Sequence, residues 1–461
     1  MTALTKSGQS DRSLIMSLAW PSIVENITAT LVTLVDTAMV GSLGAVATAA
    51  VGVCASPSWL MNGLVQSVGI GGTALVARAV GAGDRQSARH IGRQVYRIII
   101  LVSVVFAAFM FFVGAPWIPV MMQAREEVLP EARAYLRIVS SCYLLHYTAM
   151  AMASLLRGAG DTRTPMVCGL MSNLLNVVGN FFLIYPVRTI YVLGSSFTVW
   201  GADMGVRGAA AASALAMGIS SVYLLIQLGS KKSVLRLTPD FREPFDTDVF
   251  RRVIRVSVPA ALERVAINLG QILFARMISG IGTVEVAAYI IAIDVEGFGY
   301  MPAFGFSAAA TTLVGQCLGR REPENAERIG SKCIRMALWL LTVIGILMWV
   351  LSYPLASLMS SDPQVVMTAA AFIAICAFEQ PCNAVMIVTG GALRGAGDTA
   401  APFYIGLVSM WCVRIFGAWL FGFVFGLGAL AIFWAMVADL FVRSVLLLIR
   451  FRKGKWKTIQ V

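Results

Sequence analysis

Six acidic side chains lie inside stretches of sequence that are otherwise apolar. They are Glu25, Asp36, Glu263, Asp294, Glu296 and Glu379. A charge at the centre of a membrane helix costs about 2.5–3.5 kcal/mol, so each acid needs a partner, a wet cavity or a bound proton. Glu25 and Asp36 are eleven residues apart, a spacing that returns to within about 20° of one helix face. The sequence therefore predicts an acidic stripe on its first apolar segment.

The segment "SNLLNVVGN" carries three amides that could accompany such an acid, at Asn173, Asn176 and Asn180. The last two are spaced i, i+4 and face one direction on a helix. A carboxylate with amide oxygens offers the hard oxygen ligands that Na⁺ accepts, and a buried carboxyl group can equally bind and release a proton. The residues leave Na⁺ and H⁺ as alternatives. Asn173 by itself is better explained as a polar contact that holds helices together.

The second half of the chain has its own polar cluster. Glu379 and Asn383 are again spaced i, i+4, with Pro381 between them to loosen the backbone hydrogen bonds. Asp294 and Glu296 are about 200° apart around a helix, so they cannot both face one cavity squarely. We expect at most one of them to contact a substrate.

Basic side chains also fall inside the apolar stretches, at Arg264, Arg276 and Arg414. We expect them to neutralise nearby acids, for instance Arg276 or Arg414 paired with Asp294 or Glu296. The alternative is that they line a cavity for an anionic substrate. His146 lies among aromatic residues and is expected to be packed and hydrogen-bonded, with a proton relay as the alternative.

Composition indicates which elements must position these residues. Hydrophobic residues make up 58% of the 461 and charged residues only 13%, whereas soluble domains have about 25% charged residues. This predicts an all-α, polytopic membrane protein. Apolar stretches of about 20 residues predict twelve spanning helices, near 14–40, 52–77, 94–116, 132–156, 165–187, 206–229, 255–280, 286–314, 332–357, 365–393, 401–424 and 427–450. The first is long and lacks a cleavage site, so it is not a signal peptide.

The basic residues predict how these helices are oriented. Most of the 36 Lys and Arg residues fall in the tails and the even-numbered connections, which puts both termini in the cytoplasm of a multi-pass protein in the plasma (inner) membrane. The net charge of +12 then reflects topology and attraction to anionic lipid, and nucleic acid is excluded as a partner. The eight cysteines fall singly and are expected to be buried thiols, with neither disulfides nor a metal site.

The two halves of the chain repeat each other. A shift of 238 positions aligns Pro21 with Pro259 and Glu25 with Glu263 without a gap, and the heptapeptide "LRGAGDT" occurs at 156–162 and 393–399. Six helices per half is an even number, so the two lobes are related by a pseudo-two-fold axis along the membrane normal. We divide the chain into an N-terminal lobe (1–229), a charged cytoplasmic linker (230–254) and a C-terminal lobe with a basic tail (255–461), and expect a binding site between the lobes.

The heptapeptides fall on two connections and are predicted to be turns outside the transport site. Their glycines permit a left-handed turn, and Asp161 and Asp398 can cap the helix that follows. Arg157 and Arg394 are placed to meet the negative C-terminal ends of the preceding helices. The chemistry that is not duplicated, Asp36 opposite Phe274, is where we expect the function to lie.

These motifs resemble those of the multidrug and toxic compound extrusion (MATE) family of the MOP superfamily, bacterial type. The resemblance rests on the six-plus-six hydropathy, "VDTAMVG" in the first helix, "TTLVGQCLG" in the eighth and the paired "LRGAGDT". It implies a cation-coupled secondary antiporter that exports organic, often cationic amphipathic, compounds by rocking of two lobes around a V-shaped cavity. Its partners would be the substrate and the lipid bilayer, and it would work as a monomer.

The resemblance also implies ion sites. In the N-terminal lobe the family's cation site corresponds to Asp36, Asn176, Asn180 and Ser213. In the C-terminal lobe Glu263 resembles the Glu through which many members bind the coupling ion. Asn383 stands where sodium-coupled relatives carry Asp, and Glu379 could supply the missing carboxylate. Glu25, Asp294 and Glu296 are candidates for cavity or substrate contacts.

Other classes of protein fit less well. No Walker sequence, catalytic triad or metal-ligand motif is found, which predicts neither an enzyme nor ATP hydrolysis, and no cofactor beyond the coupling Na⁺ or H⁺. The alternative from another class is a flippase for a lipid-linked precursor, whose diphosphate would need several basic residues in the cavity. Six acids against three arginines inside the spans argue against it.

Overall fold

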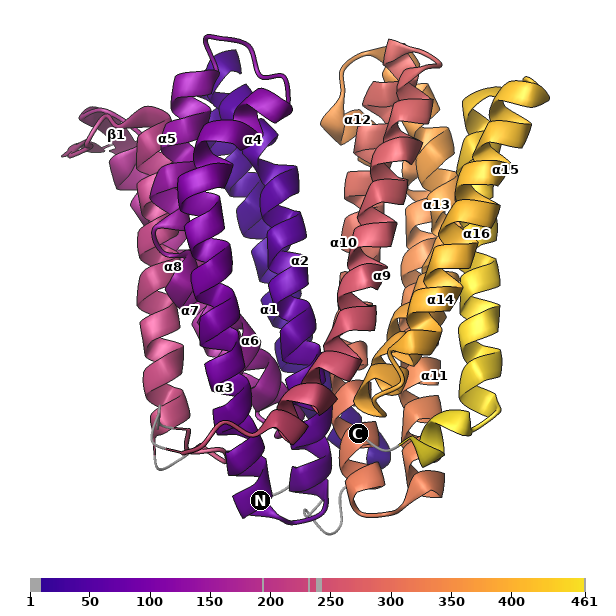
Figure 1. Ribbon diagram of the computed structural model, residues 1–461. Coiled ribbons are helices and arrows are strands. Elements are labelled where there is room, and N and C mark those ends of the chain that lie inside the picture. Colours follow the sequence, from indigo (N-terminus) through magenta and orange to yellow (C-terminus); the bar gives the residue numbers. More distant parts are fainter. Residues whose placement is uncertain (1–9, 193–194, 231–232, 238–242, 460–461) are drawn as a thin grey trace.

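The computed structural model describes residues 10–192, 195–230, 233–237 and 243–459. The linker predicted at 230–254 lies partly outside these ranges. The described chain folds into two helical lobes that stand side by side, one formed by each half of the sequence (Figure 1).

The N-terminal lobe contains six spans. In chain order they are α1 (Asp11–Gly41), α2 (Ala45–Gly81), α3 (Arg85–Ala108) continued by the π-helical turn η2 (Phe109–Gly114) and α4 (Ala115–Met121), the pair α5 (Leu129–Ser140) and α6 (Tyr143–Gly158), α7 (Arg163–Leu183) and α8 (Gly205–Gly229).

The C-terminal lobe repeats this order. Its spans are α9 (Thr247–Ser279), α10 (Thr283–Gly319), α11 (Pro323–Val350) with the short α12 (Ser352–Met359), α13 (Pro363–Gly395), the segment that runs from α14 (Ala400–Val408) through η3 (Ser409–Ile415) and α15 (Phe416–Trp419) to η4 (Leu420–Val424), and α16 (Gly428–Arg452), which is followed by η5 (Lys455–Thr458).

All twelve predicted segments coincide with helices. Among the described residues ten helices are long and apolar enough to cross a membrane, and α5 with α6, bent by 55°, makes an eleventh span. The one predicted segment not among these spans, the eighth at 286–314, lies in α10, which is 37 residues long. The prediction of a twelve-helix membrane protein is therefore confirmed.

One connection departs from the all-α expectation. Between α7 and α8 the chain forms an antiparallel hairpin of β1 (Arg188–Val192) and β2 (Ser195–Val199), with Arg188 opposite Val199 and Ile190 opposite Phe197. The strand sequences "RTIYV" and "SSFTV" are rich in β-branched and aromatic residues, which favour strands. The hydropathy pattern that located the spans says nothing about so short a connection.

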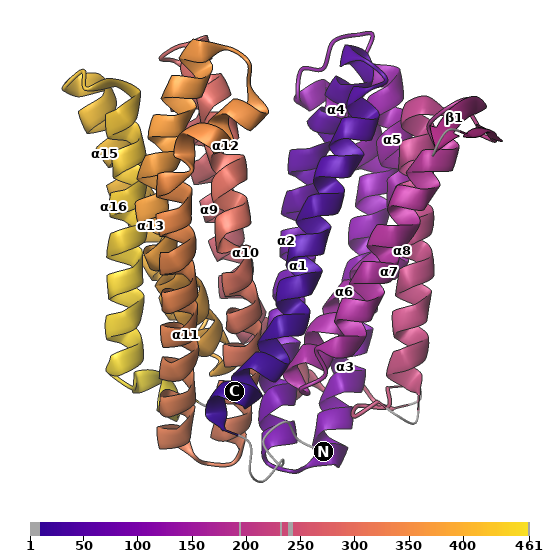
Figure 2. The ribbon, with the colours of Figure 1, turned by 180° about the vertical axis from the view of Figure 1, so that it is seen from behind.

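The two lobes meet at one end and separate toward the other (Figures 1 and 2). The first turns of α1 pack into the C-terminal lobe, since Leu14, Ile15 and Leu18 belong to the same buried cluster as residues of α10, α11 and α13. Beyond Ser22 the only buried residue of α1 is Val40. We call the end where the lobes meet the closed end and the other the open end; both chain termini lie at the closed end.

The closed end is built on a crossing of α2 and α10 that follows the internal repeat. A methyl group on Gly81 would overlap the carbonyl oxygen of Gln316, and one on Gly319 would overlap that of Arg78. Gly81 is equivalent to Gly319 in the repeat, and Arg78 to Gln316, since each pair is 238 residues apart. The same contact is therefore made twice. Only glycine lets the two backbones approach this closely.

The heptapeptides take part in this junction, and their predicted turns are confirmed. Gly160 and Gly397 have φ of 93° and 84°, and the Asp161 and Asp398 carboxylates accept hydrogen bonds from backbone amides of the following helices, at 3.0 and 3.4 Å. The carbonyl oxygen of Gly158 accepts a bond of 3.2 Å from Gln316 of the other lobe.

In the opposite direction, Arg78 donates a bond of 2.8 Å to the carbonyl oxygen of Ala396 in the second heptapeptide. Gln316 and Arg78 are equivalent positions, so each lobe reaches across to the turn of the other.

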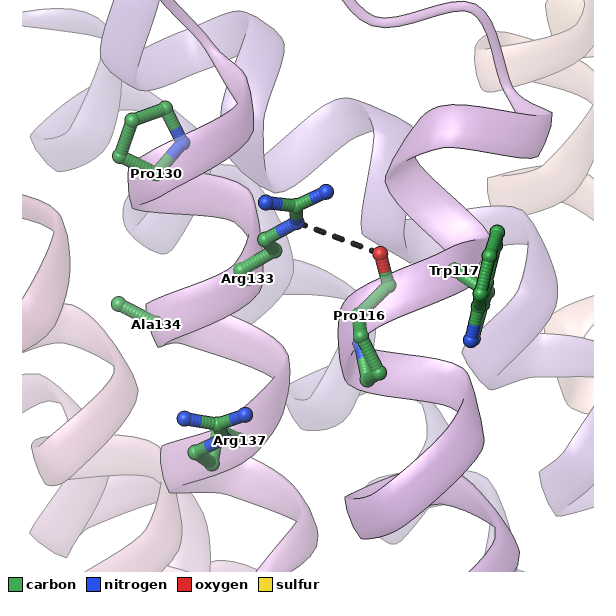
Figure 3. Close-up of a pocket in the computed structure, with 6 residues that line it drawn as sticks. All are labelled: Pro116, Trp117, Pro130, Arg133, Ala134 and Arg137. Carbon is green, nitrogen blue, oxygen red and sulfur yellow. Dashed lines mark hydrogen bonds between the residues drawn. The ribbon is translucent and has the colours of Figure 1, made fainter.

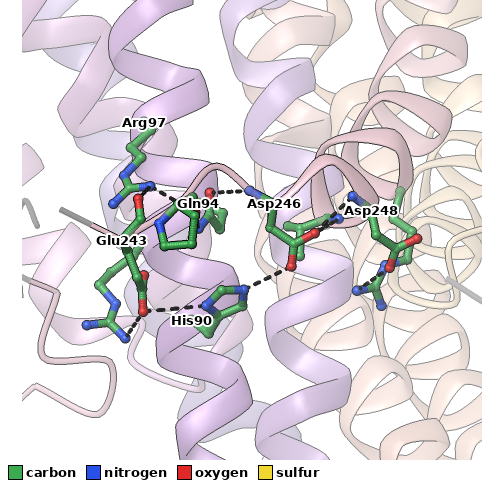
Figure 4. A network of polar contacts seen from close by, with 10 residues as sticks. His90, Gln94, Arg97, Glu243, Asp246 and Asp248 are labelled. Carbon is green, nitrogen blue, oxygen red and sulfur yellow. Dashed lines mark hydrogen bonds and ion pairs between the residues drawn. The ribbon is translucent and has the colours of Figure 1, made fainter. Parts of the chain in front are cut away.

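Polar contacts hold the described end of the linker against α3 of the N-terminal lobe, just before α9 begins. His90 on α3 bonds Asp246 at 3.0 Å and lies 3.6 Å from the Glu243 carboxylate, which Arg93 binds at 2.7 Å (Figure 4). The Asp246 carboxylate caps α9 through the amides of Asp248 and Val249. The bond from His90, with those from the two amides, holds the pKa of Asp246 below its usual value.

Candidate ion-coupling sites

The four residues that were predicted to form the N-terminal site lie together. Asn180 on α7 donates to the carboxylate of Asp36 on α1, and also to the side-chain oxygen of Asn176 at 3.4 Å. Asn176 in turn donates to the Ser213 hydroxyl on α8 at 3.0 Å. Three helices therefore contribute to one chain of hydrogen bonds, which we call the Asp36 cluster.

Close packing of α7 against α8 makes this cluster geometrically feasible. A methyl group on Gly179 would lie 2.9 Å from the Ala212 side chain, so a larger residue at 179 would push the helices apart. Asn176 and Asn180 flank this contact on α7, while Ser213 follows it directly on α8. Small residues at helix interfaces allow such close approach in membranes.

The Asp36 cluster has a negative charge without a positive partner. Asp36 is half-buried, and it forms no ion pair within the described part of the chain. Asn180 is fully buried, and its own side-chain oxygen has no hydrogen-bond partner among the described residues. A carboxylate, an unused amide oxygen and a hydroxyl thus converge, and these are oxygen ligands suited to a hard cation or a group suited to a proton.

Tyr135 on α5 belongs to the same surroundings and was missed by the sequence analysis. Its hydroxyl lies near enough to interact with Ser213 and with the Asp36 charge. A single tyrosine in "RAYLRIVS" carries no spacing signal, because only the packing of α5 against α8 brings it to the cluster.

The C-terminal lobe has a second polar cluster, made of Glu296 on α10 with Cys376, Glu379 and Asn383 on α13. The Glu296, Cys376 and Glu379 ligand atoms all lie within 4.8 Å of one another, and Asn383 donates to Glu296 at 3.4 Å. Glu379 is fully buried, and neither of its oxygens has a hydrogen-bond partner in the described structure. We call this group the Glu379 cluster.

A buried ion-pair network adjoins the Glu379 cluster. Asp439 on α16 accepts bonds from Arg414 at 2.8 Å and from Arg443 at 3.0 Å, and it also bonds Ser409. Arg414 additionally interacts with the charges of Glu379 and Glu296. The expectation that Arg414 pairs with Asp294 or Glu296 is therefore corrected, since its ion-pair partner is Asp439.

The sequence analysis overlooked Asp439 and Arg443. Both lie in the last predicted span with the i, i+4 spacing that identifies a helical ion pair. This signal was present in the sequence.

Glu263 does not join the Glu379 cluster. Its carboxylate lies 3.6 Å from Arg394 of the second heptapeptide, just as Glu25 lies 3.1 Å from Arg157 of the first. This corrects the grouping of Glu263 with Glu379. Arg157 and Arg394 lie in the last turns of α6 and α13, as expected, and in addition they neutralise the duplicated acids near the closed end.

The remaining candidates occupy separate places. Asp294 is exposed and Glu296 buried, in agreement with the expectation that the two do not share a cavity. Arg276 is exposed near the end of α9. The His146 ring packs 6.0 Å from that of Tyr147, but among the described residues it has no hydrogen-bond partner, contrary to the expectation that it is hydrogen-bonded.

All eight cysteines are free thiols. Five are buried, and Cys412 is exposed, contrary to the expectation for that residue.

A two-lobed bundle of twelve membrane helices, with a half-buried acid between helices of one lobe and buried acids in the other, is the architecture of a membrane transport protein. The MatE family model matches the chain twice, at residues 21–182 and 259–420, and these ranges are related by the same 238-residue shift as the internal repeat. The chain belongs to the MatE family, which is a family of transporters and not of enzymes. Its partners are accordingly a small-molecule substrate and the lipid bilayer.

Relatives and solved structures agree with this assignment. The chain is 29% identical to a probable multidrug resistance protein NorM of Thermotoga maritima, over 97% of this chain and 93% of the relative. It is 24% identical to the uncharacterized transporter YisQ of Bacillus subtilis, over 99% and 97%. In fold it is similar to a MOP superfamily transporter from Pyrococcus furiosus, with a TM-score of 0.86, 20% identity and 98% of both chains covered.

Proposed function

We propose that this protein is a cation-coupled antiporter that exports organic, cationic amphipathic compounds by rocking of its two lobes. The observation that carries the proposal is the Asp36 cluster, where a carboxylate meets only neutral partners and a buried amide oxygen is left unpaired. A negative charge in such surroundings is stabilised by a bound Na⁺ or H⁺. Asp36 is therefore assigned as the coupling residue, with Asn176, Asn180 and Ser213 as its partners.

The shape of the molecule supports alternating access. With both termini in the cytoplasm of a plasma-membrane protein, the open end faces outward and the α2–α10 crossing closes the cytoplasmic side. Export requires that Gly81 and Gly319 separate from the opposite helix while the lobes close at the other end. The contacts there are a few hydrogen bonds, the close approach of α2 to α10 and the apolar packing of Leu14, Ile15 and Leu18 on the C-terminal lobe, and no disulfide crosses the described junction.

The substrate class rests on the names of relatives and on the acids. A relative across nearly the whole chain is named a probable multidrug resistance protein, and Asp294 on α10 presents an exposed carboxylate that could contact a cationic group. Cation and substrate must each weaken binding of the other for exchange to be tight, which means that the coupling free energy between their sites is positive. Transport of this kind needs no ATP, and one chain supplies both lobes.

The test uses inverted membrane vesicles that take up a fluorescent organic cation under an imposed Na⁺ or H⁺ gradient, each applied separately. Wild-type protein should respond to one of the gradients, which identifies the coupling ion. Asp36→Asn should abolish that response, while Glu126→Gln, which changes an exposed loop acid, should retain it. Absence of a response to either gradient would contradict antiport and favour the flippase.

A further inference from the structure

A shallow pocket lies on the N-terminal lobe at its open end, and none of its lining residues belongs to the Asp36 cluster. It has a volume of about 490 Å³ and is lined by Pro116, Trp117, Pro130, Arg133, Ala134 and Arg137 (Figure 3). The first two residues belong to α4 and the others to α5. The pocket thus lies between the end of one span and the beginning of the next.

The pocket carries two positive charges that no acid neutralises. Arg133 and Arg137 are spaced i, i+4 on α5, and both are exposed. Arg133 donates through Nε to the carbonyl oxygen of Pro116 at 3.2 Å, which leaves its terminal nitrogens available. Neither arginine forms an ion pair within the described chain, and the nearby Glu131 is bound to Arg207 at 3.4 Å.

The span that supplies the α4 side of the pocket exposes apolar side chains. Phe112 is 73% exposed, Trp117 62% and Met121 77%, as expected for side chains in contact with lipid. Arg133 and Arg137 lie four and eight residues from the start of α5, or about 6 and 12 Å along its axis from the open end. Both guanidinium groups can therefore extend to the depth at which lipid phosphates and interfacial tryptophans lie.

We propose that this pocket binds the phosphate of an anionic phospholipid from the leaflet at the open end. Two guanidinium groups one helical turn apart can donate paired hydrogen bonds to phosphate oxygens, and the lipid supplies the counter-charge that the chain does not. Pro116, Pro130 and Ala134 provide an apolar floor for the glycerol and the first acyl carbons. Zwitterionic lipid has the same phosphate but brings its own cation, which two arginines would repel.

Native mass spectrometry of delipidated protein in neutral detergent tests this assignment. Titration with phosphatidylglycerol should show a saturable site at least about tenfold tighter than with phosphatidylcholine, which corresponds to about 1.4 kcal/mol. The double variant Arg133→Gln with Arg137→Gln should lose this preference. Arg125→Gln, at the same end of the lobe but outside the pocket, should keep it, and the paired Lys variants should retain part of it.

Three results would overturn the proposal. Equal binding of both lipids, or an unchanged preference in a double variant with wild-type thermal unfolding, would exclude a lipid site at these arginines. Displacement of phosphatidylglycerol by millimolar inorganic phosphate would assign the pocket to a soluble anion. If the Gln double variant unfolds, the Lys pair, which retains both charges, is compared with single Gln variants in the same titration.

Discussion

The two lobes hold the acids inside their spans in different electrostatic surroundings. In the N-terminal lobe Asp36 is half-buried and meets amides and a hydroxyl, with no positive side chain bound to it in the described structure. In the C-terminal lobe Glu296, Glu379 and Asp439 are buried near Arg414 and Arg443. The Asp36 cluster has no protein counter-charge in the described structure, whereas the protein's own arginines compensate most of the charge of the second site.

This difference suggests that the acids of the two lobes have different roles. In the C-terminal lobe the three buried acids and the two arginines beside them leave one negative charge. A single proton held between Glu296 and Glu379 would neutralise this charge, because two adjacent carboxyl groups do not both ionise without a cation. Because this pair is enclosed, we expect its proton to be retained during transport. In the proposed function, the half-buried Asp36 is the position at which the coupling ion exchanges.

The largest expected effect separates the two clusters directly. Asp36→Asn should reduce gradient-driven uptake by about tenfold or more, within the range typical of coupled sites, whereas Glu379→Gln should retain most uptake because it mimics the protonated group. Both variants are compared in the same vesicle assay at equal protein levels. The assignment of coupling to Asp36 is wrong if Glu379→Gln abolishes gradient-driven uptake and Asp36→Asn does not.

The ion-pair network should matter for stability more than for coupling. Asp439→Asn removes the counter-ion of two buried arginines and should destabilise the protein by about 3–5 kcal/mol. Its matched control is Asp248→Asn, which breaks an exposed ion pair with Arg252. This change should lower the free energy of unfolding by less than about 0.5 kcal/mol. Thermal unfolding in detergent measures both, and similar losses would show that Asp439 is not a structural counter-ion.

The closed end is where the two lobes should behave alike. Gly81→Ala and Gly319→Ala each place a methyl group against backbone of the other lobe, so both should favour the state in which the crossing is separated, by about 1–3 kcal/mol. Gly41→Ala, with no atom near its added methyl group, is the control.

Distances between spin labels at Gln86 and Glu324, in a background without the exposed Cys412, would report the opening. Unequal effects of the two alanine variants would mean that the crossing does not follow the repeat.

The smallest effect concerns the linker. Because the pKa of Asp246 is lowered in the folded protein, its contribution to stability is present above the unfolded value of about 3.9 and is lost as pH falls through the folded value. Hydrogen exchange at residues 246–250 should therefore be slower at pH 7 in wild type than in Asp246→Asn, and this difference should shrink as pH falls through the lowered pKa of Asp246. Ion dependence of transport should be unchanged, and a change would connect the linker to one of the two clusters.

Sequence alone predicted much of this molecule because the relevant signals are local or repeated. Twelve helices follow from hydropathy, the two-lobed duplication from the 238-residue shift, and the turns from "LRGAGDT". The grouping of Asp36 with Asn176, Asn180 and Ser213 came from the family resemblance and agrees with the contacts in the structure.

Only the tertiary structure decided which partner each buried charge has. Glu263 contacts Arg394 and not Glu379, Arg414 contacts Asp439 and not Asp294, and the arginines of the two heptapeptides bind the duplicated acids. Spacing fixes which side chains share a face of one helix, but contacts between helices depend on how each helix is rotated and which neighbour it packs against. Those rotations are set by close contacts such as Gly179 with Ala212 and Gly81 with Gln316, which join residues far apart in the sequence.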